Sequence, residues 1–72
     1  MSKYEKLWKY IEEKNEKDFV LTYDEIKNIL GFSIEHSFLN YKKELNEYGY
    51  EVVKISIKEK KIRFKKIGIW YE

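Results

Sequence analysis

The sequence contains no cysteine, a single histidine and only three glycines among its 72 residues. Because cysteine is missing, neither a disulfide nor a thiolate metal site can stabilise the chain, and packed aliphatic and aromatic side chains must do so. The one histidine, His36, has no further metal ligands at a matching spacing. The glycines stand apart from one another, which excludes a glycine-rich phosphate-binding loop. We therefore expect a protein that binds no metal or cofactor and is not an enzyme.

Long apolar runs are also missing from the sequence. None approaches the roughly 20 residues that span a bilayer, and the N-terminal stretch "MSKYEKLWKYIEEK" is charged throughout, unlike a signal peptide. These features predict a cytoplasmic protein without membrane contact. A chain of 72 residues forms one domain. Its hydrophobic residues make up 43% of the sequence, 18% being aromatic, which suffices for a small core.

The first third of the sequence predicts one helix and one short strand. Four apolar residues recur at the spacing of one helix face: Tyr4, Leu7, Trp8 and Ile11. Ser2 and Glu5 match an S-x-x-E capping box at the start of this helix. The segment "FVLT" (residues 19–22) is rich in strand formers and too short for a helix, so we expect a short strand that needs a partner elsewhere.

Two amphipathic segments follow in close succession. Thr22 and Glu25 match a second capping box, and Gly31 is placed to end that helix in a left-handed conformation. Ser33 is placed to cap the next helix, which ends at Gly49. The apolar stripe of this helix consists of Ile34, Phe38, Tyr41, Leu45 and Tyr48. The short connection predicts two helices set at an angle, as in a helix-turn-helix.

The segments 51–57 and 62–67 predict two strands that are joined at "KEKK" (residues 58–61) as a β-hairpin. A four-residue loop is favoured, because a two-residue loop would need positive φ at residues other than glycine. This register places Ile57 opposite Ile62 and Ile55 opposite Phe64. The buried face would consist of Val53, Ile55, Ile57, Ile62 and Phe64. On the open face Lys54 would lie opposite Lys65, a destabilising pair of like charges.

The order of these elements predicts an α+β fold of the winged-helix type, helix-strand-helix-helix-strand-strand, with a three-helix core and a C-terminal β-hairpin as the wing. The strand at 19–22 would join the hairpin as a third strand. Residues 1–67 would form the domain. Residues 68–72 would form an aromatic tail, whose Trp70 and Tyr71 would pack against the domain or against the second copy in a homodimer.

The segment "LTYDEIKNILGFSIEHSFLNYKKELNEYGYEV" (residues 21–52) resembles the helix-turn-helix core of many bacterial winged-helix regulators. The resemblance lies in Glu25-Ile26 at the helix start, in the turn Leu30-Gly31-Phe32-Ser33, and in the glycine of "EYGYEV". The longer pattern resembles a family of small uncharacterised bacterial and phage proteins, a domain of unknown function. It comprises "YEKLWKYI", "LTYDEIKNILG", "GYEVVKIS" and "IRF". Many members carry paired tryptophans in the third helix, where this chain has Lys42-Lys43.

The charge of the chain is unevenly distributed along the sequence. Residues 1–50 carry a net charge of −2 and residues 51–72 carry +4, which indicates an anionic partner for the C-terminal part. In helix-turn-helix proteins the second helix enters the major groove. We therefore predict a DNA-binding transcriptional regulator that contacts double-stranded DNA through four to five cations, with a slope of log K against log salt of roughly −4. The candidate residues are His36, Ser37, Asn40 and Lys43 on the helix, and Lys54, Lys58, Lys60, Lys61, Arg63 and Lys65 on the wing.

A protein-interaction module that reuses the same fold, such as a phage-encoded inhibitor or adaptor, is the alternative. The predicted recognition helix carries three glutamates against two lysines, which disfavours a position between phosphates. Leu39 flanks its polar face as an exposed apolar contact. Leu39, Trp70 and Tyr71 are therefore the candidate interface with a protein partner. A third interpretation is that the wing lysines only solvate and protect an exposed sheet face.

Overall fold

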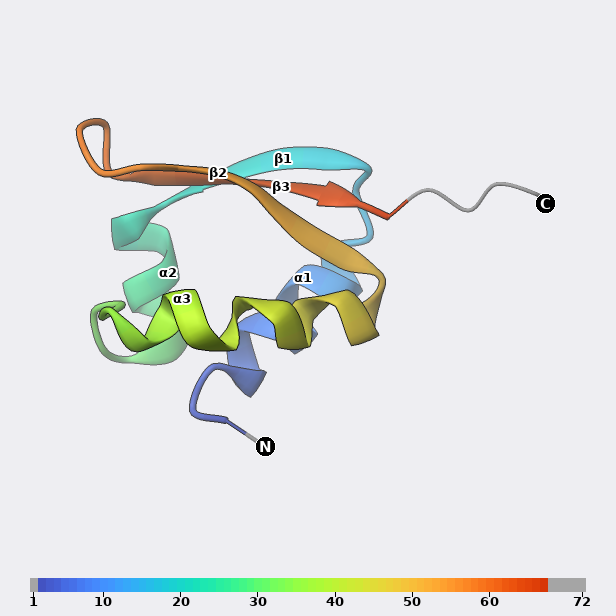
Figure 1. The fold of residues 1–72 in the computed structure, drawn as a ribbon, viewed down its shortest axis with the longest axis horizontal. Helices are drawn as coiled ribbons and strands as arrows, with labels where there is room; N and C mark the ends of the chain where they lie inside the picture. The colour runs from blue at the N-terminus through green and yellow to red at the C-terminus, as the bar shows by residue number, and fades with distance from the viewer. Residues whose placement is uncertain (1, 68–72) are drawn as a thin grey trace, which may run out of the picture.

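Three helices and a three-stranded antiparallel sheet form the fold, in a computed structural model that describes residues 2–67. The elements are α1 (Glu5–Lys14), β1 (Asp18–Thr22), α2 (Tyr23–Leu30), α3 (Ser37–Tyr41), the 3-10 helix η1 (Lys42–Tyr48), β2 (Tyr50–Ser56) and β3 (Lys61–Lys66). All helices lie on one side of the sheet (Figure 1). The prediction of an α+β fold is confirmed. Residues 68–72, with Trp70 and Tyr71, lie outside the described part of the chain.

Helix α1 buries the apolar stripe that the sequence predicts, because Leu7, Trp8 and Ile11 are all inaccessible to solvent. The predicted capping box at Ser2 is wrong. The Ser2 hydroxyl accepts a hydrogen bond from the Tyr4 amide and donates one to the carboxylate of Glu44 in η1. The Ser2 hydroxyl is therefore hydrogen-bonded to the distant Glu44 carboxylate and does not form the predicted capping box.

Helix α2 begins at the capping box that the sequence predicts. The Thr22 hydroxyl accepts from the Glu25 amide at 3.1 Å, and the Glu25 carboxylate accepts from the Thr22 amide at 2.8 Å. The helix ends at Gly31, whose φ of 88° lies in the left-handed region that favours glycine. Both predicted ends of this helix are confirmed.

Helix α3 begins at Ser37, so the prediction that Ser33 caps it is wrong. Residues 31–36 form the connection between α2 and α3 instead. From Lys42 onward the helix tightens to η1, in which residues three apart lie on the same side. Leu45 is therefore buried and Tyr48 packs against the core. Gly49 ends η1 with a φ of 88°, as predicted.

The sheet has the strand order β1-β3-β2, so the predicted third strand pairs with β3. The predicted hairpin register is wrong. Ile55 lies opposite Ile62, and a β-bulge at Val53 brings Val52 opposite Phe64. The bulge inserts one residue, so that Val52 and Ile55 both lie against the core although they are three positions apart.

The hairpin loop is four residues long, as predicted, but it consists of Ile57–Lys60. The Ser56 hydroxyl accepts a hydrogen bond from the Glu59 amide at 3.1 Å, which is typical of serine at the start of a turn. The shift changes two predicted core positions, because Val53 is 48% exposed and Ile57 is 78% exposed. It also separates the predicted like-charge pair: Lys54 lies opposite Arg63, and Lys65 lies opposite Glu51 and Asp18.

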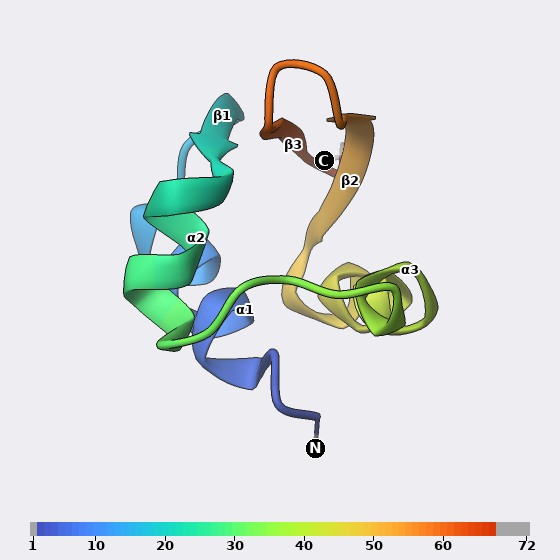
Figure 2. The same cartoon turned by 90° about the vertical axis from the view of Figure 1, so that its left-hand side faces the viewer.

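The core lies between the sheet and the helices. The aromatic part of the core is centred on Tyr4. The Tyr4 ring contacts the rings of Trp8, Phe32, Phe38 and Tyr41. Phe19 stacks on Phe64 under the sheet. Figure 2 shows the end of the molecule at which α2, α3 and the hairpin loop all face the viewer, with the hairpin loop at the top and α3 at the lower right. Within residues 2–67, no helix has the length and apolar character needed to cross a bilayer.

Candidate binding surfaces

An apolar groove of about 310 Å³ opens between α3 and the hairpin loop, and we call it the α3–hairpin groove. It is lined by Tyr23, Ile34, Glu35, His36, Phe38, Leu39, Ile55 and Ile57. Leu39 is 51% exposed and Ile57 is 78% exposed, although both are large aliphatic side chains. Two such residues on one concave, mainly apolar surface make the groove a candidate binding site.

The position of the hairpin loop keeps this groove open. The Tyr23 amide donates a hydrogen bond to the Lys60 carbonyl at 2.8 Å, which ties the start of α2 to the loop. Ile57 stands in the loop rather than in a strand, so no strand neighbour covers it. On the opposite wall, the irregular connection before α3 brings Ile34 beside Leu39. The loop and the connection together keep apart apolar side chains that would be buried if the two walls of the groove were in contact.

The hairpin loop that contributes Ile57 to the groove also carries two lysines. Glu35 is paired with Lys3 at 3.1 Å, so its negative charge is compensated. Lys58 and Lys60 follow Ile57 in the loop and are exposed, and neither takes part in an ion pair within residues 2–67. A molecule that enters the groove therefore meets apolar walls, next to a loop that carries two exposed lysines.

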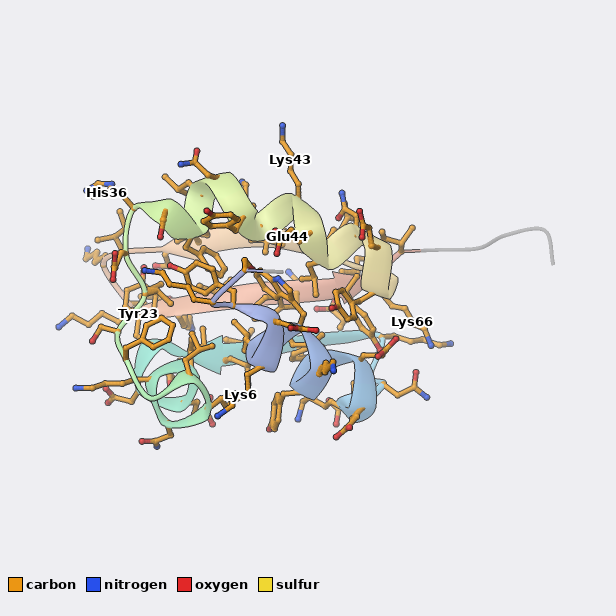
Figure 3. All side chains as sticks on the ribbon, turned by 90° about the horizontal axis from the view of Figure 1, so that it is seen from below. Lys6, Tyr23, His36, Lys43, Glu44 and Lys66 are labelled. Carbon is orange, nitrogen blue, oxygen red and sulfur yellow. The ribbon has the colours of Figure 1, made fainter. Side chains whose placement is uncertain are left out.

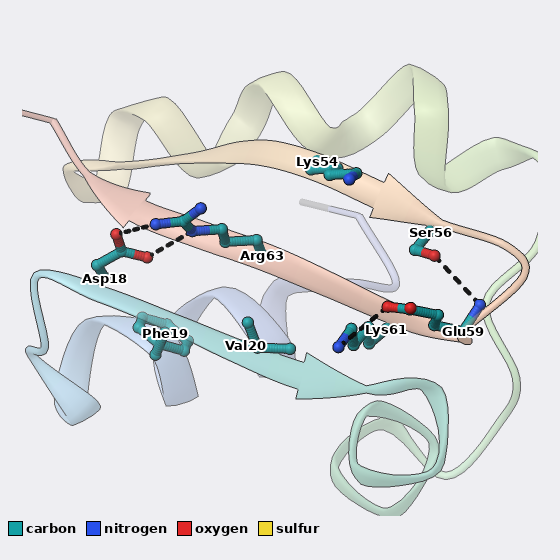
Figure 4. A pocket seen from close by; sticks show the side chains of 8 residues that line it. All are labelled: Asp18, Phe19, Val20, Lys54, Ser56, Glu59, Lys61 and Arg63. Atoms are coloured by element: carbon teal, nitrogen blue, oxygen red, sulfur yellow. Dashed lines mark hydrogen bonds and ion pairs between the residues drawn. The ribbon is translucent and has the colours of Figure 1, made fainter.

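A second hollow, of about 430 Å³, lies on the outer face of the sheet (Figure 4). It is lined by Asp18, Phe19, Val20, Lys54, Ser56, Glu59, Lys61 and Arg63. The Arg63 guanidinium donates two hydrogen bonds to Asp18, at 2.9 and 2.6 Å, and Lys61 pairs with Glu59 at 3.1 Å. The hydrogen bonds from Arg63 lower the pKa of the Asp18 carboxyl group, and the same contact raises the pKa of Arg63. Most of the charge in this hollow is thus internally compensated.

The structure divides the predicted wing cations between two surfaces. Lys54 and Ile55 are neighbours on β2, but Lys54 lines the outer hollow while Ile55 lines the α3–hairpin groove. Strand alternation places Arg63 and Lys65 on the same outer face, with Lys61. Only Lys58 and Lys60 remain in the loop. The predicted wing cations and helix α3 therefore do not form one continuous cationic surface within residues 2–67.

The four predicted binding residues of the helix differ in their exposure to solvent. The Ser37 hydroxyl shares a hydrogen bond of 2.9 Å with the Tyr4 hydroxyl and is half-buried. His36, Asn40 and Lys43 are exposed. Figure 3 shows Lys43 pointing away from the molecule, whereas Glu44 beside it is turned toward the core. Three of the four predicted residues are therefore open to a ligand.

The sequence did not identify most of the groove. Leu39 was recognised as exposed, but Ile55 and Ile57 were assigned to the buried face of the hairpin, and Tyr23 was not singled out. The one signal that could have placed Ile57 outside the core is Ser56, since serine before a turn favours a loop that starts at residue 57.

Within residues 2–67, no group of three or more histidine, cysteine, aspartate or glutamate side chains could hold a metal ion. Comparison of the chain with models of protein families, with curated proteins and with solved structures finds no match. The resemblance to winged-helix regulators therefore stays a prediction.

Proposed function

We propose that this chain is a non-enzymatic winged-helix domain that binds a segment of another protein in the α3–hairpin groove. The order of the elements supports the winged-helix assignment, as does the sheet order β1-β3-β2, in which the β2–β3 hairpin stands beside α3 as a wing. The observation that carries the proposed function is that Leu39 and Ile57 are largely exposed on the same groove.

The groove defines the chemistry of its ligand. Its volume is at the lower end of the range of roughly 300–1,000 Å³ for ligand sites, so it suits one or two large side chains of a peptide. Covering an exposed leucine or isoleucine contributes up to about 1.5–3 kcal/mol for each side chain. Lys58 and Lys60, in the loop that carries Ile57, favour an acidic residue next to the apolar one. The expected ligand is therefore an aromatic or aliphatic anchor followed by a carboxylate.

Selection of displayed random peptides on the wild-type protein tests this function, with counter-selection on an Ile57→Asp variant. Val53→Asp is the matched control, because Val53 is also an exposed aliphatic residue of the hairpin but does not line the groove. We expect peptides with an apolar anchor beside an acidic residue, which shift the NMR signals of residues 34–39 and 55–57. The proposal fails if no peptide is enriched, or if the enriched peptides bind Ile57→Asp equally well.

Double-stranded DNA is the second candidate ligand, favoured by the exposed polar side chains of His36, Asn40 and Lys43 on α3. With Lys58 and Lys60, three lysines are available on the helix and the loop. At about −0.9 per phosphate contact, they predict a slope of log K against log salt of roughly −2.7. Fluorescence anisotropy of a labelled duplex over a range of salt concentrations measures this slope, and no binding at low salt excludes DNA.

A further inference from the structure

The chain itself contains a segment with the chemistry that the groove requires. Residues 68–72, "GIWYE", combine three large apolar side chains with an acidic one: Ile69, Trp70, Tyr71 and Glu72. An indole or phenol ring suits an apolar groove of about 310 Å³. Glu72 would complement the charge of Lys58 and Lys60 in the loop that carries Ile57.

The tail cannot place Trp70 in the groove of its own chain. The Ile67 amide donates to the Gly49 carbonyl at 2.9 Å, which fixes the end of β3 beside the end of η1. From Ile67 back to Lys61, next to the hairpin loop, the strand covers about 20 Å at roughly 3.3 Å per residue. The three residues from Ile67 to Trp70 span at most about 11 Å. Figure 1 shows the end of β3 and the hairpin loop at opposite ends of the sheet.

We infer that the tail of one copy occupies the α3–hairpin groove of a second copy, with Trp70 between Leu39 and Ile57. This inference rests on the proposed function of the groove and names the segment that fills it. Direct pairing of two grooves is disfavoured, because it would bring the cationic hairpin loops of both copies, with Lys58 and Lys60, to the same interface. A segment that carries the Glu72 carboxylate meets no such repulsion.

Two full-length variants separate the two halves of this contact. The groove variant, Ile57→Asp, keeps the tail, and the tail variant, Trp70→Ser with Tyr71→Ser, keeps the groove. Ile57 is 78% exposed in a loop, so its substitution leaves the core untouched, and circular dichroism verifies that each variant is folded. Val53→Asp again serves as the control for an exposed aliphatic residue outside the groove.

Sedimentation equilibrium gives the decisive readout. We expect the wild type and Val53→Asp to self-associate with rising concentration, and each of the two variants to stay monomeric alone. Their equimolar mixture should associate to the mass of two chains and no further, because one intact tail meets one intact groove. A monomeric wild type, a self-associating Ile57→Asp variant, or a mixture that stays monomeric overturns the inference. If peptides still bind the groove in those cases, the self-association inference is wrong but the proposed function of the groove is unaffected.

Discussion

The carboxylate of Glu44 accepts a hydrogen bond from the indole nitrogen of Trp8 at 3.1 Å, and so joins η1 to α1 across 36 residues of sequence. Ser2 donates a second hydrogen bond to the same carboxylate. These bonds lower the pKa of the Glu44 carboxyl group below its ordinary value of 4.5. They connect α1 to η1, which follows directly on α3, the helix that carries Leu39 and forms one wall of the α3–hairpin groove.

Substitution Glu44→Gln should lower the free energy of unfolding by about 1 kcal/mol at pH 7, because neutral acceptors form weaker hydrogen bonds than carboxylates. Urea denaturation followed by circular dichroism measures the difference. Glu47→Gln is the matched control, since Glu47 is exposed on the same 3-10 helix and forms no side-chain hydrogen bond within residues 2–67. An equal loss in both variants would show that the Glu44 contacts add nothing to stability.

The stability difference between the wild type and Glu44→Gln should depend on pH. The pKa of Glu44 is lower in the folded chain than in the unfolded chain, so its contribution is complete above the ordinary pKa of 4.5. It is lost as the pH falls below 4.5 and through the lower pKa of the folded state. Urea denaturation at pH 7 and pH 2.5 tests this, and a difference that persists undiminished in acid contradicts it.

Lys60 has a φ of 56°, a left-handed conformation that is unfavourable for a lysine. Lys60→Gly should therefore raise the free energy of unfolding by about 0.5–1 kcal/mol, after the greater entropy of unfolded glycine is included. Lys58 belongs to the same loop and has no positive φ, so Lys58→Gly should lower stability instead. Thermal unfolding distinguishes the two, and a destabilised Lys60→Gly variant would contradict the loop conformation.

Local signals predicted the helices well, because capping and termination depend on residues close in sequence. Thr22, Glu25 and Gly31 define α2 through contacts within its own ends, and all three were placed correctly. Ser2 was misassigned because its partner, Glu44, lies 42 residues away. Periodicity also failed to reveal the change from α3 to the 3-10 helix η1, which depends on how Leu45 packs in the core.

The groove could not be predicted because it depends on the hairpin register. An alternating pattern fits several registers equally well, and the bulge at Val53 removes the constraint that alternation provides. The sequence therefore assigned Ile57 to the core. The cations of the hairpin were recognised from the sequence, which placed Lys54, Arg63 and Lys65 on the open face and Lys58 and Lys60 in the loop. The bulge changed the cross-strand partner of Lys54, which is Arg63.

Whether Leu39 and Ile57 form a binding groove can be measured through the affinity of one selected peptide for three proteins. Isothermal titration calorimetry measures its Kd for the wild type, Ile57→Asp and Val53→Asp. We predict equal Kd values for the wild type and Val53→Asp, and a Kd at least about tenfold higher for Ile57→Asp, which corresponds to about 1.4 kcal/mol. A peptide that binds Ile57→Asp as tightly as the wild type would contradict the account.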